Sequence, residues 1–237
     1  MLEAAGLSRR YGWRWALKEV NLAVPWGCSL ALLGANGAGK STLLKMLAGL
    51  LRPTAGEVRL DGAPLAARDR GRIGLVGHDP FLYPSLTLRE NLEFAAKLFG
   101  LARPRRAERI KEVAEGLGLS ERLEEPVRFL SQGLRQRASL SRALLHEPDV
   151  LLLDEPFSGL DARASDRLER LVNAYLGEGA RRLLVFTTHD PGRACAIARE
   201  AALLAGGRVA LRVPAGEAAS EAFRGALQGA ATGEGTP

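Results

Sequence analysis

A chain of 237 residues is long enough for one large domain or two small ones, which would bury roughly 70% of the surface that the unfolded chain exposes. Hydrophobic residues make up 46% and charged residues 25%, the proportions of a globular protein, which exclude disordered, collagen-like and coiled-coil architectures. The net charge of +6 comes from Arg residues scattered among acidic ones, as on a solvated surface, so we do not expect nucleic acid as a partner.

Membrane spans and covalent cross-links are not expected in this chain. Its longest apolar runs, such as residues 150–153 and 194–198, fall far short of the roughly 20 residues that cross a bilayer. Charged residues interrupt the first ten positions before an apolar core can form, so we expect no secretory leader and a cytosolic location. The two cysteines, Cys28 and Cys195, lack metal-ligand spacing and are expected to be reduced thiols.

Along the first third of the chain, short apolar runs alternate with longer segments of helical period. A glycine-rich turn over residues 34–39 separates one of these runs from the first helical segment. Strands are predicted at residues 15–24, 28–33, 57–60 and 73–76, and a helix at residues 40–49. This pattern is typical of an α/β domain.

From about residue 85 to residue 146 the pattern becomes helical, and it begins with a capping box at Thr87 and Glu90. Helices are predicted at residues 87–99, 104–117, 131–146 and 162–176, and strands return at 150–153 and 183–187. We therefore expect a mostly parallel sheet in one domain over residues 1–214, interrupted by a helical subdomain at about 85–146. Residues 215–237, rich in Ala, Gly, Ser and Glu, are expected to form a weakly ordered helix and tail.

The glycine-rich segment between the strand at 28–33 and the following helix carries the strongest chemical signal. Glycines let backbone N–H groups turn inward on a polyphosphate, and the helix N-terminus favours its negative charge. The segment fits GxxxxGK[ST] and reads Gly34, Ala35, Asn36, Gly37, Ala38, Gly39, Lys40, Ser41, with Thr42 after it. Lys40 can reach the β and γ phosphates, and the Ser41 hydroxyl can ligate Mg²⁺. A chance glycine-rich turn is the alternative, which the strand–loop–helix context disfavours.

Two carboxylates follow the apolar strand at residues 150–153. Asp154 and Glu155 would lie beside the phosphate loop, because ligands of an open α/β sheet bind at the carboxyl ends of its strands. Asp154 is then predicted to hold Mg²⁺ directly or through water, and Glu155 to act as general base toward water. Alone, such a pair is more often a turn or a helix cap. Because the chain also carries the phosphate loop, a role in binding Mg²⁺ and in catalysis is the preferred interpretation here.

Residues 130–137, with the sequence LSQGLRQR, indicate a particular class of phosphate-loop NTPase. This segment resembles the LSxGxxQR signature of the ATP-binding-cassette family, with Gln132 where a second glycine is commoner, and it precedes Asp154 by about twenty residues. The resemblance implies a phosphate-loop NTPase core with an antiparallel β subdomain and an inserted helical subdomain. It also implies that Ser131, Gln132 and Gly133 complete the nucleotide site of a second copy of the chain.

Other family positions match in order along the chain. By this resemblance, Tyr11 stacks on adenine, although a hairpin or core aromatic is an open alternative. Ser158, Gly159 and Asp161 match the loop that crosses the dimer interface, and His189 matches the histidine that contacts the γ phosphate. A surface histidine at a strand end is the alternative for His189.

One position departs from the family pattern. The glutamine that usually follows the strand at residues 73–76 and senses Mg²⁺ is replaced by His78 in the segment GHDP. An imidazole cannot donate and accept independently of pH as an amide does, and Asp79 is an alternative outer-sphere ligand. We therefore leave two readings open for His78: a functional contact to the metal, or loop packing.

The same segment suggests a subfamily. Residues 77–83, together with residues 86–92, are similar to the ATP-binding subunit of the bacterial haem exporter of cytochrome c maturation. The resemblance implies an ATP hydrolase, with ATP and Mg²⁺ as cofactors, that dimerises head to tail and drives membrane subunits from the cytoplasmic face of the bacterial inner membrane. Another small-molecule or drug exporter, and less so a soluble non-transport ATPase of the family, are the alternatives.

Overall fold

The computed structural model describes residues 1–177 and 181–232, and a six-stranded sheet forms its centre. The strand order is β10-β9-β3-β8-β7-β6, and every neighbouring pair except β10 with β9 is parallel. These strands are β3 Ser29–Leu33, β6 Ile73–Val76, β7 Val150–Leu153, β8 Leu183–Thr187, β9 Glu200–Ala205 and β10 Arg208–Pro214. The predicted mostly parallel sheet is thereby confirmed.

A second, antiparallel sheet packs on one face of the central sheet, with helix α1 (Lys40–Leu47) between them. Its order is β2-β1-β4-β5, with β1 Leu2–Tyr11, β2 Arg14–Val24, β4 Ala55–Leu60 and β5 Ala63–Pro64. One apolar core joins this sheet, α1 and the central strands. The predicted antiparallel subdomain is therefore present.

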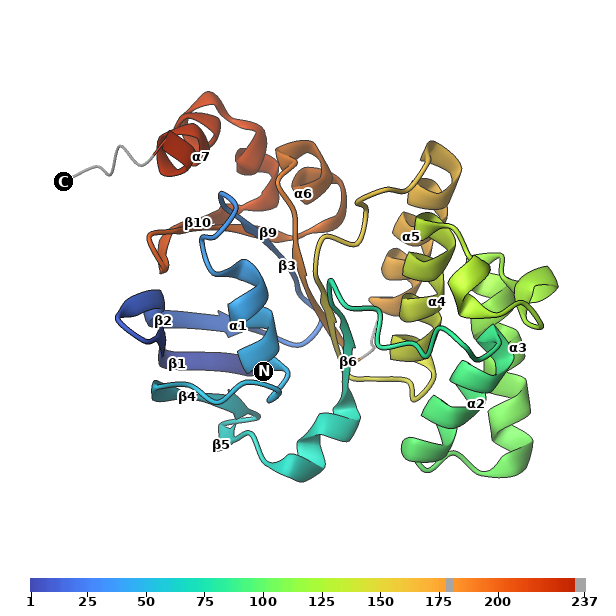
Figure 1. The fold of residues 1–237 in the computed structure, drawn as a ribbon. Coiled ribbons are helices and arrows are strands. Elements are labelled where there is room, and N and C mark those ends of the chain that lie inside the picture. The colour runs from blue at the N-terminus through green and yellow to red at the C-terminus, as the bar shows by residue number, and fades with distance from the viewer. Residues whose placement is uncertain (178–180, 233–237) are drawn as a thin grey trace.

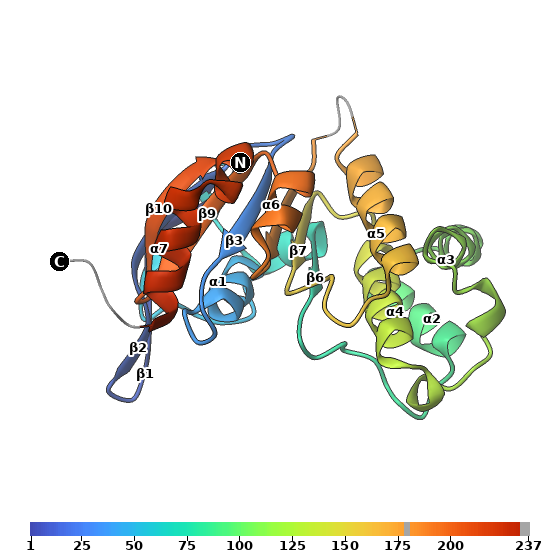
Figure 2. The ribbon, with the colours of Figure 1, turned by 90° about the horizontal axis from the view of Figure 1, so that it is seen from above.

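Helices cover the other face of the central sheet, and Figures 1 and 2 show α2 to α4 at the end of the molecule opposite the antiparallel sheet. Thr87 caps α2 as predicted: its Oγ1 accepts from Glu90 N at 3.1 Å, and Glu90 Oε2 accepts from Thr87 N at 2.8 Å. The helices on this side of the central sheet are α2 Leu88–Leu98, α3 Arg103–Leu117, α4 Gln132–Leu144, α5 Ala162–Tyr175 and α6 Pro191–Ile197. None of the helices in the described part of the chain has the length and apolar character of a membrane span.

Alternate residues of the central strands other than β10, which is largely exposed, enter two different apolar cores. In β3, Leu30 and Leu32 face α1 and the antiparallel sheet, while Ala31 and Leu33 face the covering helices. Strands buried on both faces must be apolar throughout, which is why these segments carry no polar alternation. The polar residues of the site therefore lie at or beyond the strand ends, in the loops and helix starts that follow, or at the last position of β8.

Several elements were not predicted from the sequence: β1, α6, β9 and β10. Strand β9 is rich in Ala and Leu, residues of low or neutral strand preference, and it becomes a strand by pairing with β3 in the tertiary structure. In the C-terminal region, α7 (Glu221–Thr232) follows a short turn of 3₁₀ helix, and Phe223 is buried in the core beneath the helices. Residues 233–237 of the expected tail lie outside the described residues.

Candidate functional site

A cavity of about 570 Å³ opens where β3, β6 and β7 end, a volume within the range of small-ligand sites. Most of its walls are residues that follow these three strands, joined by one residue of β2 and the start of α4. The lining residues are Ala16, Asn36, Gly37, Gly39, Lys40, Ser41, Thr42, Gly77, His78, Pro80, Gln132, Arg135, Gln136, Asp154, Glu155 and Ser158. The structure thus brings the phosphate loop, both carboxylates, His78, Gln132 and Ser158 together.

The glycines of the phosphate loop are required by the close approach of other strands. Gly39 has φ 104°, and a Cβ at this position would lie 2.5 Å from Ala16 O of β2. A Cβ on Gly34 would lie 2.4 Å from Leu204 O of β9. Only glycine fits these two positions without a shift of backbone, so the loop is held tightly between β2 and β9.

Lys40 is the buried cation of the cavity. Its ammonium donates to Gly34 O at 2.7 Å and to Ala35 O at 3.1 Å, so the side chain curls back onto its own loop. Burial lowers the pKa of Lys40, and the nearby carboxylates of Glu155 and Asp154 oppose that shift. An arriving polyphosphate would replace these carbonyl partners with charged oxygens.

The two carboxylate residues have different surroundings. Asp154 is 8% exposed, its backbone N–H donates to Val76 O at 2.8 Å, and its Oδ1 accepts from Thr187 Oγ1 at 2.7 Å. Glu155 is half-buried with φ 48°, and its Oε2 lies 3.2 Å from Nδ1 of the exposed His189. Asp154 is therefore held rigidly, whereas the carboxylate of Glu155 faces the cavity beside His189.

The donor set suits a hard divalent cation. No group of three or more His, Cys, Asp and Glu side chains converges within the described residues, so no metal cage made by the protein alone is found there. The Ser41 hydroxyl and the Asp154 carboxylate line one cavity, and Mg²⁺ characteristically takes one or two such protein ligands together with phosphate oxygens and water. These residues fit Mg²⁺ brought in with a nucleotide.

The loop after β6 places its two candidate metal contacts on different sides. His78 lines the nucleotide cavity, while Asp79 lines a second cavity, and its Oδ1 accepts from Phe81 N at 2.9 Å. Of the two, His78 is the residue on the side of Ser41 and Asp154.

The signature residues lie at the exposed start of α4. Ser131 caps this helix, with its Oγ accepting from Leu134 N at 3.3 Å, and it does not line the cavity of its own chain. Gln132 does line that cavity, and Gly133 packs against the backbone of Gly159. Asp161 caps α5 by accepting from Ala164 N at 2.8 Å.

Tyr11 ends β1 and is 50% exposed, outside the cavity. The Arg9 guanidinium lies 4.7 Å from the centroid of its ring. The ring is therefore not part of the core.

Four residues without a role predicted from the sequence also lie at the site, namely Ala16, Pro80, Gln136 and Thr187. Thr187 and Thr188 directly precede His189, and the sequence does not indicate which of the two hydroxyls turns toward Asp154. Only the pairing of β8 with both β3 and β7 determines that contact.

The second cavity, of about 580 Å³, is an aromatic groove between the loop after β6 and helices α2 and α4. Arg142 lies in its wall, donates to Leu75 O at 2.7 Å and stands 5.3 Å from the Phe81 ring centroid. The apolar side chains that line it while remaining more than a third exposed are Leu50, Phe81, Tyr83, Phe94 and Leu98. Such a concentration of exposed apolar side chains marks an interaction surface.

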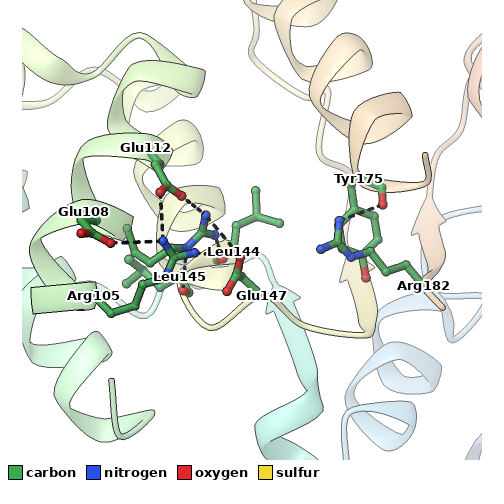
Figure 3. A network of polar contacts seen from close by, with 9 residues as sticks. Arg105, Glu108, Glu112, Leu144, Leu145, Glu147, Tyr175 and Arg182 are labelled. Atoms are coloured by element: carbon green, nitrogen blue, oxygen red, sulfur yellow. Dashed lines mark hydrogen bonds and ion pairs between the residues drawn. The ribbon is translucent and has the colours of Figure 1, made fainter. Parts of the chain in front are cut away.

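Arg105 of α3 joins an ion-pair cluster that includes two glutamates of its own helix and Glu147, which follows the end of α4 next to this groove. Figure 3 shows Arg105 among Glu108, Glu112 and Glu147, with contacts of 3.4, 3.1 and 3.2 Å. On the far side of the same view, Arg182 donates to Tyr175 O at 3.3 Å. Since Gln132 at the start of α4 lines the first cavity and Arg142 near its end lines the groove, one helix connects the two.

A family model described as ABC transporter matches residues 17–158, which hold the phosphate loop, His78, the signature and both carboxylates. The chain belongs to the ABC transporter family. It is an ABC-type ATPase domain by that membership and by its fold. The match begins after Tyr11 and ends before His189, so the interpretation of these two residues depends on the structure and on the order of the motifs.

Relatives and solved structures agree with this membership. The chain is 39% identical over 210 residues to the sn-glycerol-3-phosphate import ATP-binding protein UgpC 1 of Rhizobium johnstonii, covering 86% of this chain and 56% of that protein. It is 33% identical over 192 residues to the linearmycin resistance ATP-binding protein LnrL of Bacillus subtilis, covering 80% of this chain and 61% of that protein. The chain thus spans somewhat over half the length of these curated relatives.

Solved structures cover the chain more fully. An ATP-binding subunit of an ABC transporter superposes with a TM-score of 0.84 and 31% identity over 99% of this chain and 98% of that one. A dimeric post-hydrolysis state of the cassette MJ0796 bound to ADP and Pi has a TM-score of 0.83 and 27% identity over 91% of this chain and 99% of that one. The cbiO1 protein from Clostridium perfringens, part of the complex cbiONQ, has a TM-score of 0.79 and 28% identity over 94% and 92% of the two chains.

Proposed function

We propose that this chain is the nucleotide-binding subunit of an ABC transporter and that it hydrolyses MgATP in a head-to-tail dimer. The observation that carries the proposal is one cavity that holds a buried ammonium, a hydroxyl and two carboxylates: Lys40, Ser41, Asp154 and Glu155. A bound polyphosphate would contact the Lys40 ammonium and the Ser41 hydroxyl, and the two carboxylates would then face a cation and a water molecule.

Each residue has a role that follows from its position. Lys40 and the backbone of the phosphate loop bind the β and γ phosphates, and Mg²⁺, when bound with ATP, neutralises charge that develops on them. Glu155 accepts the proton of the attacking water, and His189, in contact with its carboxylate, donates to the γ phosphate or orients that water. Thr42 extends the loop into the cavity wall.

The dimer follows from residues that the site of one chain leaves unused. Ser131 caps α4 at an exposed edge and Gly133 lies beside it, outside the cavity of their own chain. In a head-to-tail pair this exposed helix start would close over the nucleotide of the other copy, with Ser158, Gly159 and Asp161 at the contact. The dimeric form of the MJ0796 cassette supports this arrangement.

Integral membrane subunits are the second proposed partner, with the chain peripheral on the cytoplasmic face of the inner membrane. The aromatic groove offers exposed apolar side chains to a partner segment, and the loop from His78 to Tyr83 forms a wall of both cavities. Loss of the γ phosphate would thus change the shape of the groove through this shared loop. That cbiO1 is part of a transporter complex supports a partner of this kind.

We propose export as the direction of transport and haem as the cargo, for cytochrome c maturation. The support is the segment from Gly77 to Tyr83, in which His78 replaces the usual glutamine. Export of another small molecule or drug is the second candidate, favoured by the similarity to the linearmycin resistance protein. Purified transporter in vesicles, assayed for haem and for linearmycin-like substrates, separates the two.

The hydrolytic role is tested with Glu155→Gln. This variant is expected to bind ATP, to accumulate as a dimer in light scattering and to lose hydrolysis by roughly 10²- to 10⁴-fold, because the base is removed while the phosphate contacts remain. Glu115→Gln, an exposed substitution on α3, is the matched control and should hydrolyse at the rate of the unmodified protein. Normal turnover by Glu155→Gln would contradict the assignment of the base.

A further inference from the structure

The hydroxyl of Thr187 bridges the two carboxylate residues of the nucleotide cavity. Its Oγ1 donates to Asp154 Oδ1 at 2.7 Å and accepts from Glu155 N at 2.8 Å. The side chain is completely buried, so water does not compete for either bond. One oxygen therefore holds the carboxylate of the first residue and the backbone of the second.

The sheet topology accounts for this contact. Strand β8 lies between β3 and β7, and Thr187 is its last residue. Leu32 of β3 pairs with Thr187, and Leu153 of β7 pairs with Phe186, so the Thr187 side chain comes level with Asp154. It is thus placed between the strand that precedes the phosphate loop and the strand that precedes the carboxylates.

Glu155 needs such an anchor because its backbone is unusual. Its φ of 48° lies in the left-handed region that residues with side chains rarely adopt. Thr187 holds the N–H of this residue, and His189, two positions further along the chain, meets its carboxylate at 3.2 Å. The backbone N–H and the carboxylate of Glu155 are therefore both held by residues at or just after the end of β8.

We infer that Thr187 is a positioning residue for ATP hydrolysis, an inference that rests on the roles proposed above for Asp154 and Glu155. Its hydroxyl orients the Asp154 carboxylate and fixes the backbone of Glu155, so that the base points at the water. A valine of nearly the same shape fills the space but leaves both groups without their partner. A serine keeps the hydroxyl.

The experiment compares Thr187→Val and Thr187→Ser with a control of the same kind elsewhere in the sheet. Ser29, the first residue of β3, is also buried. Its hydroxyl donates to Ile197 O at 3.2 Å and accepts from Arg199 N at 3.0 Å. Ser29→Ala therefore also removes one donated and one accepted hydrogen bond of a buried hydroxyl, at a residue that does not line the cavity. For each variant kcat, KM, ATP affinity by titration calorimetry and urea unfolding are measured.

Thr187→Val is expected to lower kcat roughly 10- to 100-fold, from the loss of a bond to a charged group and a bond to a backbone N–H. Its ATP affinity should change less than about threefold, since the phosphate loop is untouched, and Thr187→Ser should recover kcat to within about threefold. Ser29→Ala should lose stability and keep kcat. Unchanged kcat in Thr187→Val, or a Thr187→Ser variant as slow as Thr187→Val, would overturn the inference.

The Glu155→Gln variant keeps this test separate from the test of the proposed function. A slow Thr187→Val with a fast Glu155→Gln overturns the assignment of the base and supports positioning through Asp154. A slow Glu155→Gln with a fast Thr187→Val overturns the role of Thr187 alone.

Discussion

His146 is expected to make the folded protein less stable as the pH falls below about 6.5. It follows α4 in the wall of the aromatic groove, with its Nε2 3.3 Å from Ile73 O and its ring stacked on Phe99 at a centroid distance of 3.7 Å. Burial lowers its pKa from 6.5 to about 4. Between these values the unfolded chain binds a proton that the folded chain does not, so stability rises with pH and is lost on acidification.

The size of the effect follows from the two pKa values. With 6.5 in the unfolded and about 4 in the folded protein, the free energy of unfolding falls by about 2 kcal/mol between pH 7 and pH 5, and by about 3 kcal/mol below pH 4. His146→Gln removes the titrating ring and keeps an N–H that can donate to Ile73 O. The difference between the two proteins isolates His146 from every other group that titrates.

The assay is urea unfolding of both proteins at pH 7 and pH 5. The unmodified protein should lose about 2 kcal/mol more than His146→Gln on this change of pH. Equal losses in the two proteins would refute the argument, because the ring would then be as solvated in the folded state as in the unfolded one. His146→Phe, which keeps the ring stack on Phe99, serves as a second variant that does not titrate.

Two substitutions test the phosphate loop and the C-terminal helix. Gly39→Ala should weaken ATP binding at least about tenfold, because its Cβ would lie 2.5 Å from Ala16 O at a φ of 104°, and titration calorimetry measures the loss. Phe223→Ala should lower the free energy of unfolding by about 3 kcal/mol in urea with ATP affinity unchanged, since the side chain is 1% exposed and does not line the nucleotide cavity. Gly225→Ala on α7, where an added Cβ meets no atom within 4 Å beyond the neighbouring backbone, is the control for both: ATP affinity should be unchanged, and the free energy of unfolding should not fall and can rise by up to about 1 kcal/mol.

The order of the elements could be predicted wherever local signals are strong. The capping box at Thr87, the glycine turn before Lys40 and the apolar strand before Asp154 each encode their structure within a few residues. Strands β1, β9 and β10 could not be predicted in this way. Strand β9 consists mostly of Ala and Leu and becomes a strand by pairing with the distant β3, whereas β1 and β10 each form one arm of a hairpin, with β2 and β9 respectively.

For the site, the sequence by itself determined which chemical groups are present: a phosphate loop with its lysine, two carboxylates after a strand, and a histidine after another. It also determined the family, because the order and spacing of these motifs are local properties of the chain. The tertiary structure decided how the groups meet. Insertion of β8 between β3 and β7 directs the hydroxyl of Thr187 onto Asp154 and Glu155, and the turn after β6 sends His78 and Asp79 into different cavities. Strand order and side-chain direction depend on pairings between residues 33 positions apart for β7 with β8 and 155 positions apart for β3 with β8, which no local pattern encodes.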